Sequence, residues 1–112
     1  MNEATKNETT DETAGQVQRL VRRVVCAANK LDDGTVICGA RHWDGVMRAV
    51  CRKLDDSAGR TVTVAEQGFI DQRGRFLSRQ EAWEVAEAAG QIARRVGGDK
   101  SNGGTLYSEN LY

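Results

Sequence analysis

Apolar and polar positions form the clearest pattern in the second half of the chain. Phe69 and Phe76 flank the polar tetrad Asp71–Gly74, whose composition is typical of a tight turn ending on a residue with positive φ. Ser78 and Glu81 then stand at the spacing of a helix capping box. Small apolar residues behind them share one helical stripe: Ala82, Val85, Ala86, Ala89 and Ala93. This order predicts a hairpin that leads directly into a helix.

A similar unit is predicted ahead of it. The apolar spacing of residues 22–29 fits either a helix or a strand. The Asp-Gly turn within 31–34 and the β-rich run 35–40 favour the strand, because a hairpin requires two partners. Apolar residues after this hairpin repeat at intervals of three and four, which predicts an amphipathic helix. They are Trp43, Val46, Met47, Val50, Cys51 and Leu54.

The connecting segments are predicted from their composition. Residues 55–60 carry Asp, Ser and Gly, so we expect a loop. Residues 61–64 fit either a short strand or a spacer. Four glycines within 96–104 predict a mobile connection, whereas residues 105–112 regain apolar alternation and are expected to pack onto the domain as a short β-like tail.

The predicted fold class is α+β: a small single domain of two ββα-like units with an antiparallel sheet, covering residues 16–112. Residues 1–15 are rich in Glu, Asp, Asn and Thr, which predicts a disordered tail. A domain of this size with 5% aromatic residues builds a marginal core alone, so we expect an oligomer. Trp83 and Ile92 lie off the alanine stripe, and we expect them to be exposed and to seal a subunit interface.

Composition limits the classes of function. Sixteen basic and sixteen acidic residues balance, which argues against binding to a nucleic-acid polymer but permits a local pocket for one small anion. No apolar run approaches the roughly 20 residues of a membrane helix, and the start of the chain lacks the pattern of a secretory signal. We therefore expect a soluble protein of the cytoplasm. Cys26, Cys38 and Cys51 form no Cys-x-x-Cys pair, which predicts buried thiols rather than a zinc site or a disulfide framework.

The sequence offers few catalytic groups. His42 is the only histidine and has no second metal ligand at helical spacing, so neither a metal nor a cofactor is predicted. Nucleophile elbow, Walker loop and dinucleotide glycine motifs are all absent from the sequence. A cysteine nucleophile served by His42 is an enzymatic alternative, but the three cysteines occupy predicted core positions. We therefore do not expect an enzyme.

Arginines at two predicted helix starts favour an anion site instead. Arg41 and His42 stand where a strand gives way to a helix, and free amides together with a guanidinium group suit a phosphate. Alternatively, Arg41 pairs with a carboxylate and His42 caps the helix. Arg75 and Arg79 bracket the start of the second helix, although arginines so placed are commonly solvated. Phe69 lies beside a glycine and can stack a base, or it is a core residue of the hairpin.

Four segments in one order carry a family resemblance. They are Gly39–His42; Glu66–Asp71 with Gly74–Phe76 and Arg79; Glu81 and Ala82 leading to Ala88–Gln91; and Leu106–Leu111. As a set they resemble the first type of Thoeris anti-defence protein, a phage protein family, over residues 22–112. The chain departs from that family's pattern in its acidic tail and at Asn110, where an aspartate is expected.

The resemblance implies a homohexameric, non-enzymatic sponge that captures cyclic ADP-ribose isomers, or cyclic oligonucleotides, in the host cytoplasm without cleaving them. Neither a nucleic-acid polymer, a membrane nor a cofactor is implied as a partner. Carried over to this sequence, the implied ligand-binding residues are Arg41, His42, Phe69, Asp71, Arg75, Arg79 and Asn110. Two alternatives stay open. One is a protein-binding inhibitor of a host defence factor that uses the second helix, and the other is an enzyme that cleaves the same cyclic nucleotides.

Overall fold

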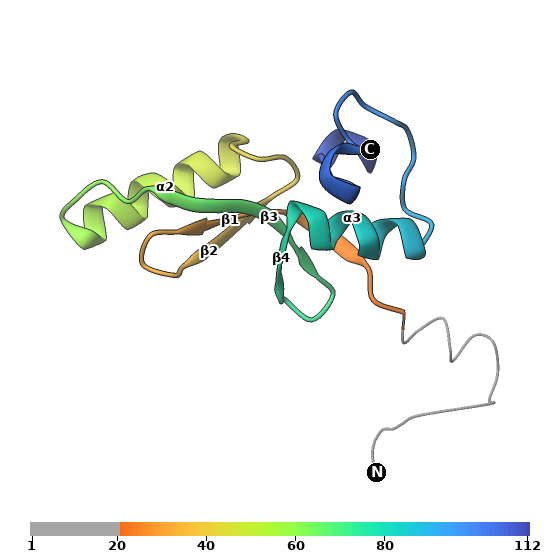
Figure 1. The fold of residues 1–112 in the computed structure, drawn as a ribbon. Coiled ribbons are helices and arrows are strands. Elements are labelled where there is room, and N and C mark those ends of the chain that lie inside the picture. Colours follow the sequence, from red (N-terminus) through yellow and green to blue (C-terminus); the bar gives the residue numbers. More distant parts are fainter. Residues whose placement is uncertain (1–20) are drawn as a thin grey trace, which may run out of the picture.

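The computed structural model describes residues 21–112, which form one four-stranded sheet and two α-helices (Figure 1). The order along the chain is β1 (Val24–Leu31), β2 (Val36–Gly39), α2 (Gly45–Ala58), β3 (Val64–Asp71), β4 (Phe76–Ser78) and α3 (Arg79–Ala88). Two short 3₁₀ turns follow, η1 (Ser101–Gly103) and η2 (Ser108–Asn110). The predicted α+β class is confirmed. The tail predicted at 1–15 lies outside the described residues.

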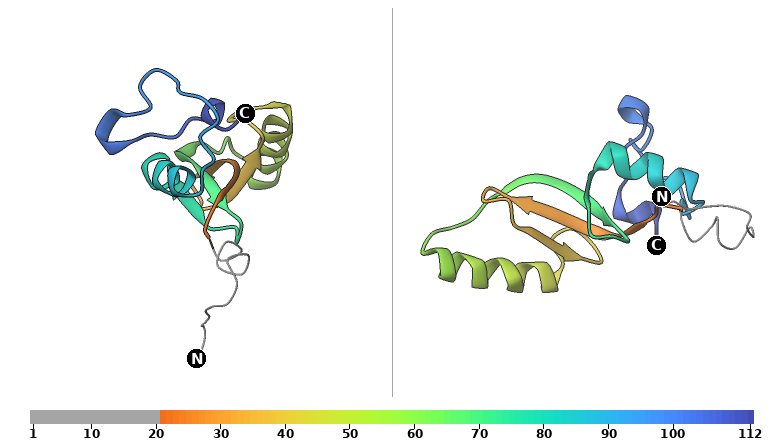
Figure 2. Two further views of the ribbon diagram at one scale, coloured as in Figure 1. Left: turned by 90° about the vertical axis from the view of Figure 1, so that its right-hand side faces the viewer. Right: turned by 90° about the horizontal axis from the view of Figure 1, so that it is seen from below.

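The four strands lie in the spatial order β2-β1-β3-β4, and every neighbouring pair is antiparallel. Ala27 pairs with Phe69, and Phe69 pairs with Leu77, so these three side chains share one face. Both helices pack on this face, α2 over the β1–β2 half and α3 over the β3–β4 half. Figure 2 shows the C-terminal segment beside α3, with the end of the chain near the start of α2.

Both hairpin turns form as predicted. The Asp71 carbonyl oxygen accepts a hydrogen bond from the Gly74 amide at 2.9 Å, and Gly74 has a φ of 77°. The Asp71 side chain accepts further bonds from the amides of Arg73 and Arg75, both at 2.9 Å. The turn between β1 and β2 is closed by a 2.9 Å bond from the Gly34 amide. Local polar chemistry therefore determines where both hairpins reverse.

Helix α3 begins without a linker. Ser78 ends β4 and also caps α3, since its hydroxyl accepts from the Glu81 amide at 3.1 Å while the Glu81 carboxylate accepts from the Ser78 amide at 2.9 Å. The predicted capping box is thus confirmed; a cap of this kind stabilises a helix by about 1 kcal/mol. The helix ends earlier than predicted, at Ala88, because Gly90 with a φ of 71° reverses the chain. Ala93 is therefore not part of the helical stripe.

Helix α2 is longer than predicted. Asp44 caps it by accepting a hydrogen bond from the Met47 amide at 2.9 Å, and the helix continues to Ala58. Gly59, with a φ of 67°, ends it. The loop predicted for residues 55–60 is therefore helical over most of its length.

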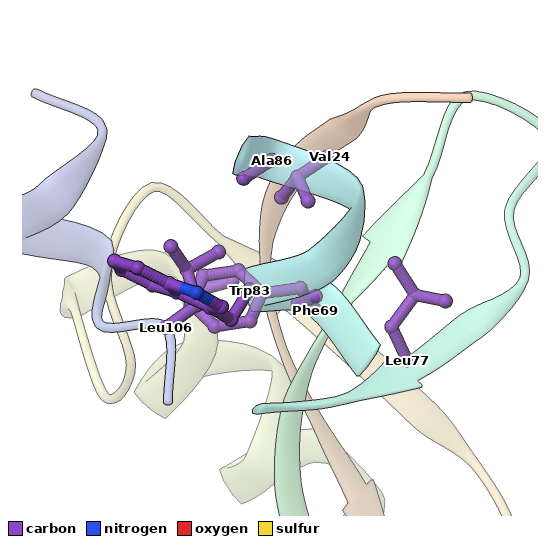
Figure 3. Packing of buried hydrophobic residues seen from close by; sticks show 8 residues of the cluster. Val24, Phe69, Leu77, Trp83, Ala86 and Leu106 are labelled. Carbon is purple, nitrogen blue, oxygen red and sulfur yellow. The ribbon is translucent and has the colours of Figure 1, made fainter. Parts of the chain in front are cut away.

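The apolar core is divided into two clusters that share no residue. The first lies under α3 (Figure 3) and contains Val24, Ala27, Phe69, Leu77, Ala82, Trp83, Ala86 and Leu106. The second lies under α2 and contains Leu31, Ile37, Met47 and Val62. Since β2 has only four residues to pack against, part of the predicted α2 stripe stays outside this cluster: Val46 is 65% exposed.

The predicted exposure of Trp83 and Ile92 is wrong. Trp83 is only 5% exposed, and Ile92 packs against the same cluster. The reason is the close passage of the chain at Gly104, where a Cβ atom would lie 2.0 Å from the indole Cδ1 of Trp83. Helix α3 therefore does not present these two residues as anchors.

The three cysteines are less buried than predicted. Cys26, Cys38 and Cys51 are free thiols with intermediate exposure. The C-terminal residues pack onto the domain as predicted, with Leu106 fully buried, but they form η2 rather than a β-like tail. Among residues 21–112, no helix is both long and apolar enough to cross a membrane.

We expect Gly104→Ala to lower the free energy of unfolding by about 3 kcal/mol, because overpacking costs about 1–3 kcal/mol and a strained φ adds a similar amount. Gly104 has a φ of 123° and lies against Trp83. Gly97→Ala is the matched control in the same segment, since nothing lies within 4 Å of its added Cβ. Urea unfolding checks both, and equal effects of the two substitutions would contradict the close packing.

Candidate functional site

A group of polar side chains separates the two apolar clusters where α2 and α3 begin. We term Arg41, His42, Gln67 and Arg79 the polar seam. Arg41 and His42 come from the loop between β2 and α2, Gln67 from β3, and Arg79 is the first residue of α3. Arg79 contacts His42 and Gln67 directly, whereas Arg41 belongs to the group as the residue that precedes His42.

Arg79 is the centre of the polar seam. Its guanidinium donates to the Leu106 carbonyl at 2.8 Å and to the Gln67 side-chain oxygen at 3.0 Å. It lies over the rings of Phe69 and Tyr107, at 5.9 and 5.1 Å from their centroids. Within residues 21–112 no carboxylate oxygen lies within 4.0 Å of it. Burial lowers the pKa of Arg79, but a guanidinium stays protonated at neutral pH. Arg79 is thus a half-buried cation held by neutral groups.

His42 is fixed in one tautomer by its neighbours. Its Nε2 lies 2.7 Å from the Gly68 carbonyl oxygen, and its Nδ1 lies 3.4 Å from the Arg79 guanidinium. Because a carbonyl only accepts and a guanidinium only donates, Nε2 carries the proton and Nδ1 is the acceptor. Burial lowers the pKa of His42, and Arg79 contributes in the same direction against the opposing bond to Gly68. His42 is therefore neutral at pH 7, and both ring nitrogens have partners.

Arg41 has an unused donor. Its Nη2 donates to the Tyr112 carbonyl oxygen, and its guanidinium lies 5.1 Å from the centroid of the Tyr112 ring. Glu109 approaches Nη1 only to 3.9 Å, and this buried nitrogen has no hydrogen-bond partner among the described residues. The alternative prediction, that Arg41 pairs with a carboxylate, is thus met only by a long contact with Glu109. The other alternative, capping of the helix by His42, is not realised, since Asp44 is the cap.

The loop that carries Arg41 and His42 is strained. Trp43 has a φ of 60°, a conformation that bulky residues rarely adopt. The backbone amide of Trp43 donates a hydrogen bond to the sulfur of Met47 at 3.3 Å, which helps to hold the loop. Such strain costs about 1–3 kcal/mol and concentrates at functional sites. The strain therefore marks the same loop that supplies the two polar residues.

Phe69 belongs to the core. Its ring is 0% exposed and packs in the α3 cluster, with His42 edge-on at 5.1 Å between centroids. The predicted stacking of a base on Phe69 therefore lacks an open ring face. The accessible aromatic ring beside Arg41 is Tyr112, which is 46% exposed. Burial of Phe69 depends on α3 and Leu106, neither of which its local sequence reveals.

Asp71 and Arg75 lie outside the polar seam, at the turn between β3 and β4. The Asp71 carboxylate binds two turn amides and also accepts from Arg22 Nε at 2.8 Å. Burial raises the pKa of Asp71, but the hydrogen bonds from the Arg75 amide and Arg22 outweigh it, so the pKa is lowered overall. Asp71 thus holds the turn together, while the Arg75 side chain is exposed.

Asn110 lies in a third place, buried within the C-terminal part of the chain. Its side-chain nitrogen donates to the Arg94 carbonyl at 2.9 Å and to the Asp99 carboxylate at 3.1 Å, while its oxygen accepts from the Tyr107 amide. A hydrogen bond from Arg95 holds the pKa of Asp99 well below its usual range, so Asp99 is ionised. The amide at position 110 is explained by this contact, because an aspartate there would face a second carboxylate.

Four residues around Arg41 and Arg79 were not predicted from the sequence. Gln67 binds Arg79, Tyr107 stacks on it, and Glu109 and Tyr112 contact Arg41. The family resemblance indicated residues 106–111 as a segment, but only the fold shows which of its side chains face the arginines. Within residues 21–112 no cluster of His, Cys, Asp and Glu side chains is arranged to hold a metal ion.

Comparison with known proteins gives one informative result. A family model described as "Phage T4 y16D protein" matches residues 23–112, which includes both hairpins, both helices and the whole polar seam. No curated protein and no solved structure matches the chain.

We expect Asn110→Asp to lower the melting temperature by several degrees at pH 7, because the new carboxylate would lie against the ionised Asp99. Repulsion raises the pKa of the pair in the folded state, so the loss should shrink as the pH falls toward about 4, the ordinary range of carboxyl groups. Thermal unfolding from pH 3 to 8 measures this.

Asn102→Asp is the matched control, since Asn102 is exposed and the same charge is added. A loss that is equal in the two variants, or independent of pH, would contradict the assignment of Asn110 as a donor to Asp99.

Proposed function

We propose that this chain, which belongs to the Phage T4 y16D protein family, is a phage-encoded binding protein that captures a small phosphate-containing ligand at the polar seam. The resemblance to Thoeris anti-defence proteins suggests the ligand class: a cyclic ADP-ribose isomer or a cyclic oligonucleotide. The protein would sequester such a signal without cleaving it.

The positive charge of Arg79 carries this proposal. A half-buried guanidinium has lost part of its hydration, and here its hydrogen-bond partners are neutral acceptors. A phosphate offers the counter-charge that these groups lack, and it can accept two parallel hydrogen bonds from a guanidinium. An anion bound at this position therefore gains more binding free energy than an anion bound beside an exposed arginine that already has a carboxylate partner.

Arg41 supplies a second cation on the loop that also carries His42. It directly precedes His42, whose ring contacts Arg79, and its Nη1 has a donor to offer. The exposed Tyr112 ring beside it is the available surface for a base. Charge-assisted hydrogen bonds contribute roughly 1.5–3 kcal/mol each and a stacked base about 1–3 kcal/mol. Several such contacts together approach the roughly −12 kcal/mol of nanomolar binding.

The states of the potential catalytic groups support binding rather than cleavage. Both ring nitrogens of His42 are engaged, so the residue is poorly placed to move a proton. Burial, with a contribution from Cys38, raises the pKa of the Cys26 thiol to about 11, and burial also raises that of Cys51. Both groups are therefore thiols at neutral pH, and a thiol is a weak nucleophile.

The sequence argument for the alternative, a protein-binding inhibitor, no longer holds. It depended on Trp83 and Ile92 as exposed anchors on the second helix, and both residues pack in the core. The homohexamer implied by the resemblance stays part of the proposal. Subunit contacts near Tyr112 would bring additional groups to a ligand held by Arg41, and native mass spectrometry measures the subunit number directly.

We expect Arg41→Ala to weaken binding by about 10- to 100-fold, the equivalent of one lost charge-assisted hydrogen bond. The full chain is titrated by calorimetry with a panel of cyclic ADP-ribose isomers and cyclic di- and trinucleotides. Arg48→Ala is the matched control, because Arg48 is an exposed arginine of α2. Arg79→Lys tests the central cation while a positive charge is retained.

A wild-type chain that binds no member of the panel would refute the proposal, and so would equal losses in the Arg41 and Arg48 variants. Chromatography after incubation and heat denaturation separates capture from cleavage. Recovery of the intact ligand supports a sponge, whereas recovery of products would show an enzyme.

A further inference from the structure

The turn between β3 and β4 holds a second group of arginines, far along the hairpin from the polar seam. A pocket of about 110 Å³ opens there, lined by Arg22, Asp71, Gln72, Arg73 and Arg75. We term it the turn pocket. Three guanidinium groups and one carboxylate leave it with two excess positive charges, in a chain whose overall net charge is zero.

We propose that the turn pocket is a separate binding site for a phosphate-type anion with two or more negative charges, such as a pyrophosphate or phosphate monoester group. The proposal is independent of the function assigned to the polar seam. It rests on three observations: the single carboxylate is already in use, the frame of the pocket is built by hydrogen bonds, and the two arginines that remain have no carboxylate partner among the described residues.

The carboxylate of Asp71 does not neutralise the other two arginines. Its side chain is only 1% exposed, and it accepts from Arg22 Nε and from the amides of Arg73 and Arg75. Among residues 21–112 the side chains of Arg73 and Arg75 have no carboxylate oxygen within 4.0 Å. Their charges are therefore available to a ligand.

Hydrogen bonds hold the chain that carries Arg22 against the turn. The Gln72 side chain accepts from the Arg23 amide at 2.9 Å and donates to the Val21 carbonyl at 2.9 Å. Arg22 lies between these two anchored residues and is bound to Asp71 at 2.8 Å. The backbone positions of all three arginines are therefore set before a ligand arrives, which lowers the entropy lost on binding.

The volume and the charge agree on the ligand class. A pocket of about 110 Å³ is several times the roughly 30 Å³ that one water occupies in the liquid, so it has room for a tetrahedral anion. Guanidinium groups bind phosphate oxygens in pairs, and an excess of two positive charges favours an anion with two or more negative charges. A cationic ligand would be repelled by these side chains, and a neutral ligand would leave their charge uncompensated.

The test is a titration of the full chain with inorganic pyrophosphate, at about 50 mM salt so that screening is limited. Binding is followed by the backbone amide signals in a two-dimensional NMR spectrum. We expect saturable shifts centred on residues 72–75. Arg73→Gln and Arg75→Gln should each weaken binding about tenfold, the loss of roughly one charge-assisted contact. Both side chains are exposed, so the fold should be retained.

Arg52→Gln is the matched control, since it removes one charge from the exposed side of α2, and it should change the affinity less than twofold. An equal loss in this variant would show non-specific attraction and overturn the site. Absence of saturable binding, or shifts centred on other residues, would overturn it as well.

The two proposed sites are distinguished by exchanging variants and ligands. Arg41→Ala should keep pyrophosphate binding at the turn pocket, and Arg75→Gln should keep cyclic-nucleotide binding at the polar seam. Loss of pyrophosphate binding in Arg41→Ala would refute the turn pocket while leaving the polar seam intact.

Discussion

The guanidinium group of Arg79 connects the β2–α2 loop, whose Trp43 packs against the cluster under α2, with three segments of the cluster under α3. It reaches β3 through Gln67, the β2–α2 loop through His42 and the C-terminal segment through Leu106, while its own backbone starts α3. Desolvation of this charge is unfavourable, and the neutral acceptors and two aromatic rings around it offset that cost. This polar contact thus adds to the continuous β1–β3 pairing in joining the two halves of the molecule.

Local signals in the sequence were sufficient for most of the secondary structure. Asp71 and Gly74 specify their turn through bonds within four residues, and Ser78 and Glu81 specify the start of α3 in the same way. Such contacts depend only on neighbours in the chain, so a pattern of a few residues is enough to predict them. The start of α3, which supplies Arg79, was predicted for this reason. The start of α2, next to Arg41, was predicted from apolar spacing instead, and its cap Asp44 was not predicted.

Contacts between distant segments were not predictable. Trp83 is buried because the backbone at Gly104 packs against it. Asn110 hydrogen-bonds to Asp99, which explains the amide at that position. Neither contact corresponds to a periodic pattern in the sequence. The same limit applies to the candidate site. The sequence could propose Arg41, Phe69 and Arg79 as separate residues, but only the fold shows that Phe69 is covered and that Tyr112 is the ring beside Arg41.

The division of the core has a practical consequence for spectroscopy. The chain contains two tryptophans, and each half of the molecule holds one: Trp43 packs against the cluster under α2, and Trp83 belongs to the cluster under α3. Replacing one indole at a time by phenylalanine would turn intrinsic fluorescence into a separate reporter for each half. Coincident melting of the two signals would show that both halves behave as one cooperative unit.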